Sequence, residues 1–158
     1  MSKRNALLTP IAALAATVLL AHGNPREEVK AQIGGAEVSV EYGRPSLKGR
    51  DMLGQATEGM VWRVGADKSA TLTASAGLVF GEQALAAGSY TLKARKDAGD
   101  AWTLLLEAGE STTEVPLQVR ALDESVELFT IRVSGEGGRG RLELHWGARA
   151  LATGFSAD

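Results

Sequence analysis

Cysteine is absent from this chain of 158 residues, and histidine occurs only twice. Without cysteine the protein can form no disulfide, no thiolate metal site and no thiol nucleophile. The absence also excludes a lipoprotein anchor, which needs a cysteine. His22 lies in the N-terminal segment, so His145 is the only histidine of the remaining chain. Zinc sites built from three histidines or from cysteine and histidine are therefore excluded, and the sequence predicts neither a metal site nor a cofactor.

Long uncharged apolar runs are also lacking, except at the N-terminus. Lys3 and Arg4 precede an apolar run over 6–21, and small residues occupy positions −3 and −1 before Asn24. This run is shorter than the ~20 residues that cross a bilayer, so it predicts a cleaved signal peptide over 1–23. The expected mature domain covers 24–158 and contains no membrane span. We expect it to be exported to the periplasm or beyond the cell.

Positive charge is not in excess. Without Lys3 and Arg4, 15 basic residues face 19 acidic ones, which gives a net charge of −4. This balance argues against nucleic acid as a partner. The remaining length fits a single domain that buries about 70% of its unfolded surface.

Helical periodicity is missing after the N-terminal run, whereas alternation of apolar and polar residues is frequent. Alternating segments occur at 37–42, 89–95, 115–121, 129–133 and 141–146, and less regular apolar runs occur at 70–73, 78–80 and 102–106. Short strands with glycine-rich turns predict an all-β fold, an antiparallel β-sandwich or flattened barrel of about eight strands. The polar stretch 24–31 is expected to be a lead-in, with at most a turn of helix.

The alternation also predicts which side chains form the core. The residues expected to be buried are Tyr42, Leu92, Leu117, Ile131, Leu144 and Trp146. His145 alternates with Leu144 and Trp146, so we expect it to face solvent. A catalytic triad would have to use this histidine, and a general base is the alternative to a plain surface residue.

Aromatic residues make up only 5% of the chain, which is little for a sugar-binding surface. Trp102 and Trp146 lie in apolar strand patterns and are expected in the core. Trp62 is ambiguous, because it follows Met60 and Val61 but could also offer a ring face to a sugar.

A basic loop follows the strand that ends at Tyr42. Arg44, Lys48 and Arg50 lie among prolines and glycines, and Arg63 follows Trp62 shortly afterwards. Three cations on one loop suit an anionic group, such as a carboxylate, a phosphate or a uronic acid. The same arginines could instead brace the loop by donating to backbone carbonyls. Both interpretations remain open.

The same region carries a recognisable pattern: Tyr-x-Arg-Pro from Tyr42, Lys-Gly-Arg-x-x-x-Gly from Lys48, and Val-Trp-Arg-x-Gly-Ala from Val61. With these motifs, the chain over 33–147 resembles the bacterial domain-of-unknown-function 2911 family. This family has no established activity, so the resemblance implies no reaction. The chain departs from the family pattern after Leu106, where the expected Trp-Gly and tyrosine segment is missing. A shared role would then depend on residues 42–66.

These observations favour an exported, non-catalytic binding or envelope-associated module. The candidate ligand-binding residues are Arg44, Lys48, Arg50, Trp62 and Arg63, and no catalytic residue is assigned. The expected partner is an anionic small molecule or glycan, or an envelope protein. The alternative is a small hydrolase or transferase acting near Arg44–Arg63, although the spacing of the acidic residues selects no catalytic pair.

Overall fold

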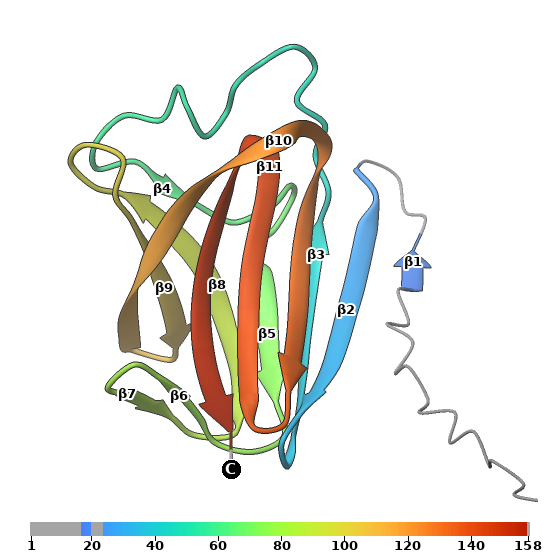
Figure 1. Ribbon diagram of the computed structural model, residues 1–158, viewed down its shortest axis with the longest axis vertical. Coiled ribbons are helices and arrows are strands. Elements are labelled where there is room, and N and C mark those ends of the chain that lie inside the picture. Colours follow the sequence, from blue (N-terminus) through green and yellow to red (C-terminus); the bar gives the residue numbers. More distant parts are fainter. Residues whose placement is uncertain (1–16, 20–23, 158) are drawn as a thin grey trace, which may run out of the picture.

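The computed structural model describes residues 17–19 and 24–157, and every regular element in them is a β-strand (Figure 1). The strands are β1 (Thr17–Leu19), β2 (Arg26–Ile33), β3 (Ala36–Gly43), β4 (Val61–Trp62), β5 (Ala70–Ala74), β6 (Leu78–Phe80), β7 (Gln83–Leu85), β8 (Gly88–Lys96), β9 (Trp102–Ala108), β10 (Ser111–Glu136) and β11 (Arg139–Ala157). The prediction of an all-β antiparallel fold is confirmed.

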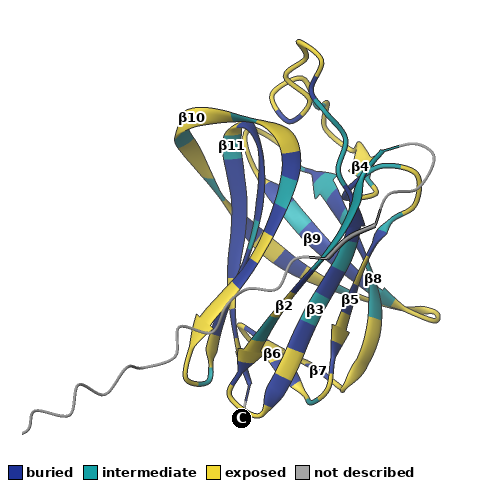
Figure 2. Ribbon diagram, turned by 90° about the vertical axis from the view of Figure 1, so that its right-hand side faces the viewer, coloured by how far each residue is buried: buried dark blue, intermediate teal, exposed yellow. Residues whose placement is uncertain are grey.

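The strands form one antiparallel sheet in the order β1-β2-β3-β5-β8-β9-β10-β11-β6-β7, with β4 paired to β8. Figures 1 and 2 show that this sheet folds over itself into two layers. Strands β2, β3, β5, β8 and β9 form one layer, and the arms of β10 and β11 form the other. The order ends at β1 and β7 without closing into a ring.

Both long strands bend near the middle, so that each contributes two arms (Figure 1). The register of β10 against β11 shifts between Ala121 and Val126 and again before Thr130. Strand β11 turns at Gly147, whose φ of 63° suits a residue without a Cβ. The C-terminal arm then returns beside the start of β11, where the Ala157 amide donates to the Gly138 carbonyl at 2.8 Å. One continuous strand pair thereby builds most of the second layer.

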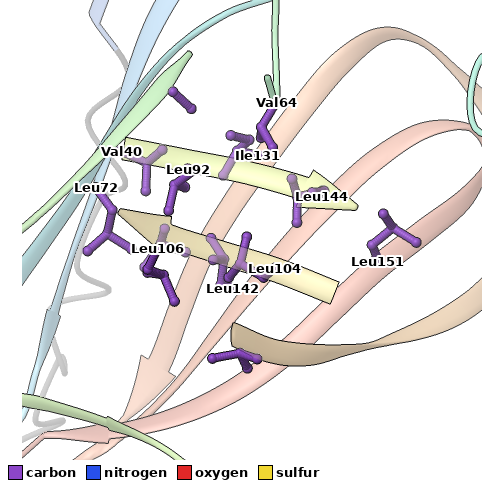
Figure 3. Packing of buried hydrophobic residues seen from close by; sticks show 14 of the residues in the cluster. Val40, Val64, Leu72, Leu92, Leu104, Leu106, Ile131, Leu142, Leu144 and Leu151 are labelled. Carbon is purple, nitrogen blue, oxygen red and sulfur yellow. The ribbon is translucent and has the colours of Figure 1, made fainter. Parts of the chain in front are cut away.

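Aliphatic and aromatic side chains from both layers fill the space between them (Figure 3). All six predicted core residues are buried: Tyr42, Leu92, Leu117, Ile131, Leu144 and Trp146. Leu104, Leu105 and Leu106 are buried in succession, as expected for a strand covered on both faces. The alternation therefore identified the inward face correctly on these strands.

Two expectations are wrong. The stretch 24–31 is no lead-in, because Arg26–Ile33 forms β2 and pairs with β3 along its length. His145 points away from Leu144 and Trp146 as expected, yet only 4% of it is exposed. The bend of β10 covers it, since Leu122 and Val126 lie with it around one hollow. Alternation along one strand cannot reveal such a cover.

Most of the expected signal peptide, residues 1–23, lies outside the described residues. Within it, Thr17–Leu19 forms β1, which pairs with Arg26–Glu28 of β2. In the described part of the chain, no helix has the length and apolar character needed to cross a membrane.

Candidate functional site

The basic loop joins β3 to β4 and rises from the end of the sandwich at the top of Figures 1 and 2. The first residues of the loop are hydrogen-bonded to β10, in the other layer of the sandwich. Ser46 forms an isolated bridge with Leu128 of β10, the Leu47 amide donates to the Glu127 carbonyl at 3.1 Å, and the Phe129 amide donates to the Pro45 carbonyl at 3.0 Å. The start of the loop thus extends the edge of β10 and links the two layers.

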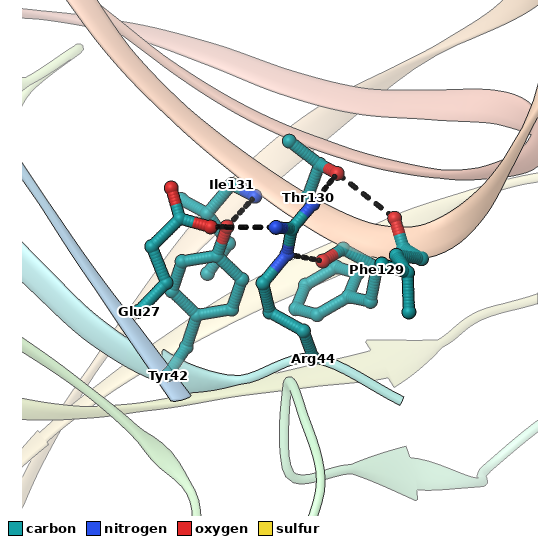
Figure 4. Close-up of polar contacts among 7 residues, drawn as sticks. Glu27, Tyr42, Arg44, Phe129, Thr130 and Ile131 are labelled. Carbon is teal, nitrogen blue, oxygen red and sulfur yellow. Dashed lines mark hydrogen bonds and ion pairs between the residues drawn. The ribbon is translucent and has the colours of Figure 1, made fainter. Parts of the chain in front are cut away.

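Arg44 uses its whole guanidinium in this link (Figure 4). Its Nε donates to the Phe129 carbonyl at 3.0 Å, and Nη2 donates to Thr130 Oγ1 at 2.9 Å. Its Nη1 lies 2.9 Å from Glu27 Oε2 in an ion pair whose side chains are 22% and 11% exposed. Arg44 therefore braces the loop against β2 and β10, as in the second of the two interpretations of the basic loop.

Tyr42 completes this arrangement. Its hydroxyl accepts the Ile131 amide at 2.9 Å and donates to Glu27 Oε2 at 3.3 Å. Burial raises the pKa of Tyr42 to about 12, and the neighbouring Glu27 carboxylate adds to the increase. The phenol stays neutral at physiological pH and serves as a fixed hydrogen-bond partner.

Trp62 belongs to an aromatic cluster with Phe129 and Trp146. It stacks on Trp146 with ring centroids 5.5 Å apart and planes inclined by 18°, and it meets Phe129 edge-on at 4.8 Å. Trp146 Nε1 donates to the Glu127 carbonyl at 3.2 Å. One face of the Trp62 ring is thus covered from within the protein, and its contacts are those of a packing residue.

The segment after Trp62 packs closely on the end of β3. Gly65, with φ 130°, lies so near Gly43 that an added Cβ would come within 2.8 Å of the Gly43 carbonyl oxygen. Val64 is buried at φ 56°, a left-handed conformation that is rare for a β-branched residue. The Arg63 Nη1 donates to the Asp67 carbonyl at 3.0 Å and braces this turn. The close approach of these two backbone segments thus explains why positions 43 and 65 are both glycine.

Lys48 and Arg50 differ from Arg44. Neither side chain forms a hydrogen bond or ion pair with a described residue, and both are exposed. Arg50 lies on an open hollow of about 410 Å³ between the loop and the bends of β10 and β11. The hollow is lined by Leu47, Gly49, Arg50, Asp51, Ser125, Glu127, Gly147 and Ala148.

Glu127 holds the loop at this hollow. Its Oε1 accepts the Ser46 hydroxyl at 2.5 Å and the Lys48 amide at 3.0 Å. The hydrogen bond from Ser46, followed by that from the Lys48 amide, holds the pKa of Glu127 below its usual range. Asp51 Oδ1 accepts the Gly54 amide at 3.0 Å. The hollow therefore combines one unpaired guanidinium with two carboxylates whose geometry is fixed.

The family described as "Protein of unknown function (DUF2911)" matches residues 24–154, most of the chain. The chain belongs to the DUF2911 family. The resemblance inferred from residues 42–66 is thereby confirmed. Neither a curated protein nor a solved structure matches the chain.

In this DUF2911 protein the first and third of the three sequence motifs meet in space. Tyr42 and Arg44 of the first motif and Trp62 of the third all contact Phe129 or its neighbours on β10. The five predicted site residues therefore divide into two groups. Arg44, Trp62 and Arg63 are engaged in structural contacts, whereas Lys48 and Arg50 point to no protein partner among the described residues.

Sequence reasoning did not single out two acidic residues of this region, Glu27 and Glu127. Glu27 falls in the stretch expected to be a lead-in with at most a turn of helix, and the alternation of Val29, Ala31 and Ile33 begins only after it. Glu127 carried no signal, because its role depends on a loop about 80 residues earlier in the chain. Over residues 24–157, no group of three or more acidic or histidine side chains is arranged to hold a metal ion.

Proposed function

We propose that this DUF2911 protein is an exported, non-catalytic module that binds an acidic glycan at the hollow beside Arg50. The observation that carries the proposal is the Arg50 guanidinium, which is unpaired within residues 24–157 and lies on a concave surface. Arginine binds carboxylates with two parallel hydrogen bonds, and an unengaged one is well suited to a ligand.

The other residues of the hollow favour a ligand with hydroxyl groups as well as a negative charge. Asp51, Glu127 and Ser125 supply acceptors and a hydroxyl around Arg50. A uronic acid offers a carboxylate to Arg50 and hydroxyl donors to Asp51 and Glu127, and these hydrogen bonds offset the repulsion between the ligand and the two carboxylates. The apolar surface of Leu47 and Ala148 adds contact area for a sugar ring.

The electrostatics of the hollow support binding over catalysis. A general acid in glycoside hydrolysis needs a raised pKa. The hydrogen bond from Ser46 acts on Glu127 in the opposite direction and keeps it ionised. Glu127 is thereby suited to accept hydrogen bonds, and it also fixes the loop that carries Arg50.

Export is the second part of the proposal, and it is supported by the basic start, the short apolar run and the small residues before Asn24. The mass of the protein recovered from the periplasm or the medium tests it. We expect an N-terminus near Asn24. Full-length protein that is extracted only with detergent would contradict export by a cleaved signal.

The ligand is tested by titrating the protein with oligogalacturonate, and with a neutral oligosaccharide of the same length as reference. We expect saturable binding of the acidic oligomer only, weakened at least about tenfold by Arg50→Gln through loss of a bidentate contact. Arg139→Gln is the matched control, since Arg139 is also exposed and unpaired in the described region but lies at the start of β11, beside the turn from β10. Equal weakening by both substitutions would indicate only bulk charge and would refute the site.

A further inference from the structure

His145 lies in an unusual setting on the outer face of β11. It is 4% exposed, and its Nε2 is buried without a hydrogen-bond partner. The nearest acidic atom, Glu143 Oε2, is 3.7 Å away. A buried imidazole normally has a partner for its polar atoms, because leaving one unpaired costs free energy.

The bend of β10 lies over His145, and a hollow of about 470 Å³ lies beneath this bend. It is lined by Arg120, Ala121, Leu122, Asp123, Glu124, Val126, Arg132 and His145. Both arms of β10 contribute to this hollow, because Arg120 precedes the bend and Arg132 follows it. In Figure 1 the bend arches across the top of the two arms of β11.

Only some of the charged groups around this hollow have a partner within the protein. Glu143 accepts a hydrogen bond from Arg120 Nη2 at 3.2 Å and forms an ion pair with Arg141 Nε, also at 3.2 Å. Arg132 has no ion pair among residues 24–157, although it lies opposite Glu143 in the β10–β11 register. Asp123 and Glu124 are exposed on the bend itself. Arg132, Asp123 and Glu124 therefore have no ion-pair partner among the described residues, and His145 Nε2 has no hydrogen-bond partner.

The protonation of His145 responds to these neighbours. Burial lowers the pKa of His145, and the positive charges of Arg132 and Arg120 lower it further, against the opposing effect of Glu143. The imidazole is therefore neutral at neutral pH. An anion placed among these groups would offset the repulsion and favour the protonated form.

We propose that the hollow beneath the β10 bend is an oxyanion site, in which Arg132, Arg120 and His145 together bind a phosphate or carboxylate group. The guanidinium of Arg132 supplies the free fork of donors, and the imidazole supplies a third donor once it is protonated. This site is distinct from the hollow beside Arg50, because the two share no lining residue.

Proton and anion binding are linked at this site. Because the bound anion raises the pKa of His145, the anion must bind more tightly when the histidine is protonated. A rise of about one pKa unit corresponds to binding up to about tenfold tighter at acidic than at alkaline pH. The acidic groups that face the site are Glu143, Asp123 and Glu124. Burial acts to raise the pKa of Glu143, but Arg141, His145 and Arg120 outweigh it and hold this pKa below its usual range.

The test is an NMR titration of the His145 ring protons in the full chain carrying His22→Gln, which leaves one imidazole. The pKa of His145 is measured in chloride, inorganic phosphate and succinate at equal ionic strength. We expect phosphate, succinate or both to raise this pKa by at least about half a unit with saturation. Saturation by phosphate alone would identify a phosphate site, and saturation by succinate alone a carboxylate site. Identical values in all three salts would overturn the proposal.

Substitutions locate the effect. Arg132→Gln should abolish the saturable shift, and it should also raise the pKa of His145 in chloride because a repelling charge is removed. Arg139→Gln removes an equivalent exposed charge from the same hairpin and should change neither result. If Arg139→Gln abolished the shift as well, the anion effect would be general screening and the site would be refuted.

Discussion

Replacement of Arg44 by glutamine should destabilise the protein strongly, because this side chain joins three separate segments. The substitution leaves the Phe129 carbonyl and Thr130 Oγ1 without their donor, and it leaves Glu27 with only the Tyr42 hydroxyl. Glu27 is 11% exposed, so water compensates its charge incompletely. Breaking a buried pair costs ~3–5 kcal/mol. The partial exposure of Arg44 places our expectation at about 3 kcal/mol, at the lower end of that range.

The measurement is reversible denaturant unfolding, supported by thermal melts. A loss of about 3 kcal/mol corresponds to a fall in Tm of roughly 10 °C for a domain of this size. Arg50→Gln is the matched control on the same loop, because its side chain has no partner in residues 24–157, and its Tm should change by less than about 2 °C.

A double-mutant cycle with Glu27→Gln separates the ion pair from the rest. If the two groups interact directly, the second substitution should cost less in the Arg44→Gln background than alone. A loss below about 1 kcal/mol for Arg44→Gln, or equal effects of Arg44→Gln and Arg50→Gln, would refute the brace.

Three further outcomes follow from the packing. Trp146→Ala should cost ~3–5 kcal/mol in denaturant unfolding, because it removes a buried ring that stacks on Trp62; a loss below about 1 kcal/mol would contradict its burial. The folded state should lose stability as pH falls through 6.5, since His145 has a lowered pKa and the unfolded chain binds the proton first; His145→Gln should reduce this slope between pH 7 and 5. Gly65→Ala should lower Tm markedly, as its φ of 130° and the Gly43 carbonyl both oppose a Cβ, whereas Gly49→Ala, with open space around it, should lower Tm less.

The sequence predicted the strands whose inward positions are apolar. Val38, Val40 and Tyr42 alternate cleanly, and β3 was found with nearly its true bounds. Strand β2 was missed because its first inward residue is Glu27, a charge that breaks the pattern. This charge is tolerated inside only because Arg44 and Tyr42 come from later in the chain to bind it.

The sequence grouped Arg44 and Arg50 in one candidate loop, but the different contacts of the two arginines could not be predicted from it. Arg44 and Arg50 are equivalent as residue types, and both lie in a turn rich in glycine and proline. What distinguishes them is the edge of β10, whose carbonyl at Phe129 is reached by Arg44 alone. The burial of His145 likewise depends on a bend about 20 residues earlier. Local patterns carry no information on such long-range contacts.

The most direct test of the proposed binding role is a map of amide chemical shifts during titration with oligogalacturonate. If the hollow beside Arg50 is the site, amides of 47–51, 125–127 and 147–148 should shift together and saturate at one concentration. Signals of the brace around Arg44, at Glu27, Tyr42 and Thr130, should keep their positions. Shifts confined to other surfaces, or the same saturating shifts in Arg50→Gln, would contradict the account.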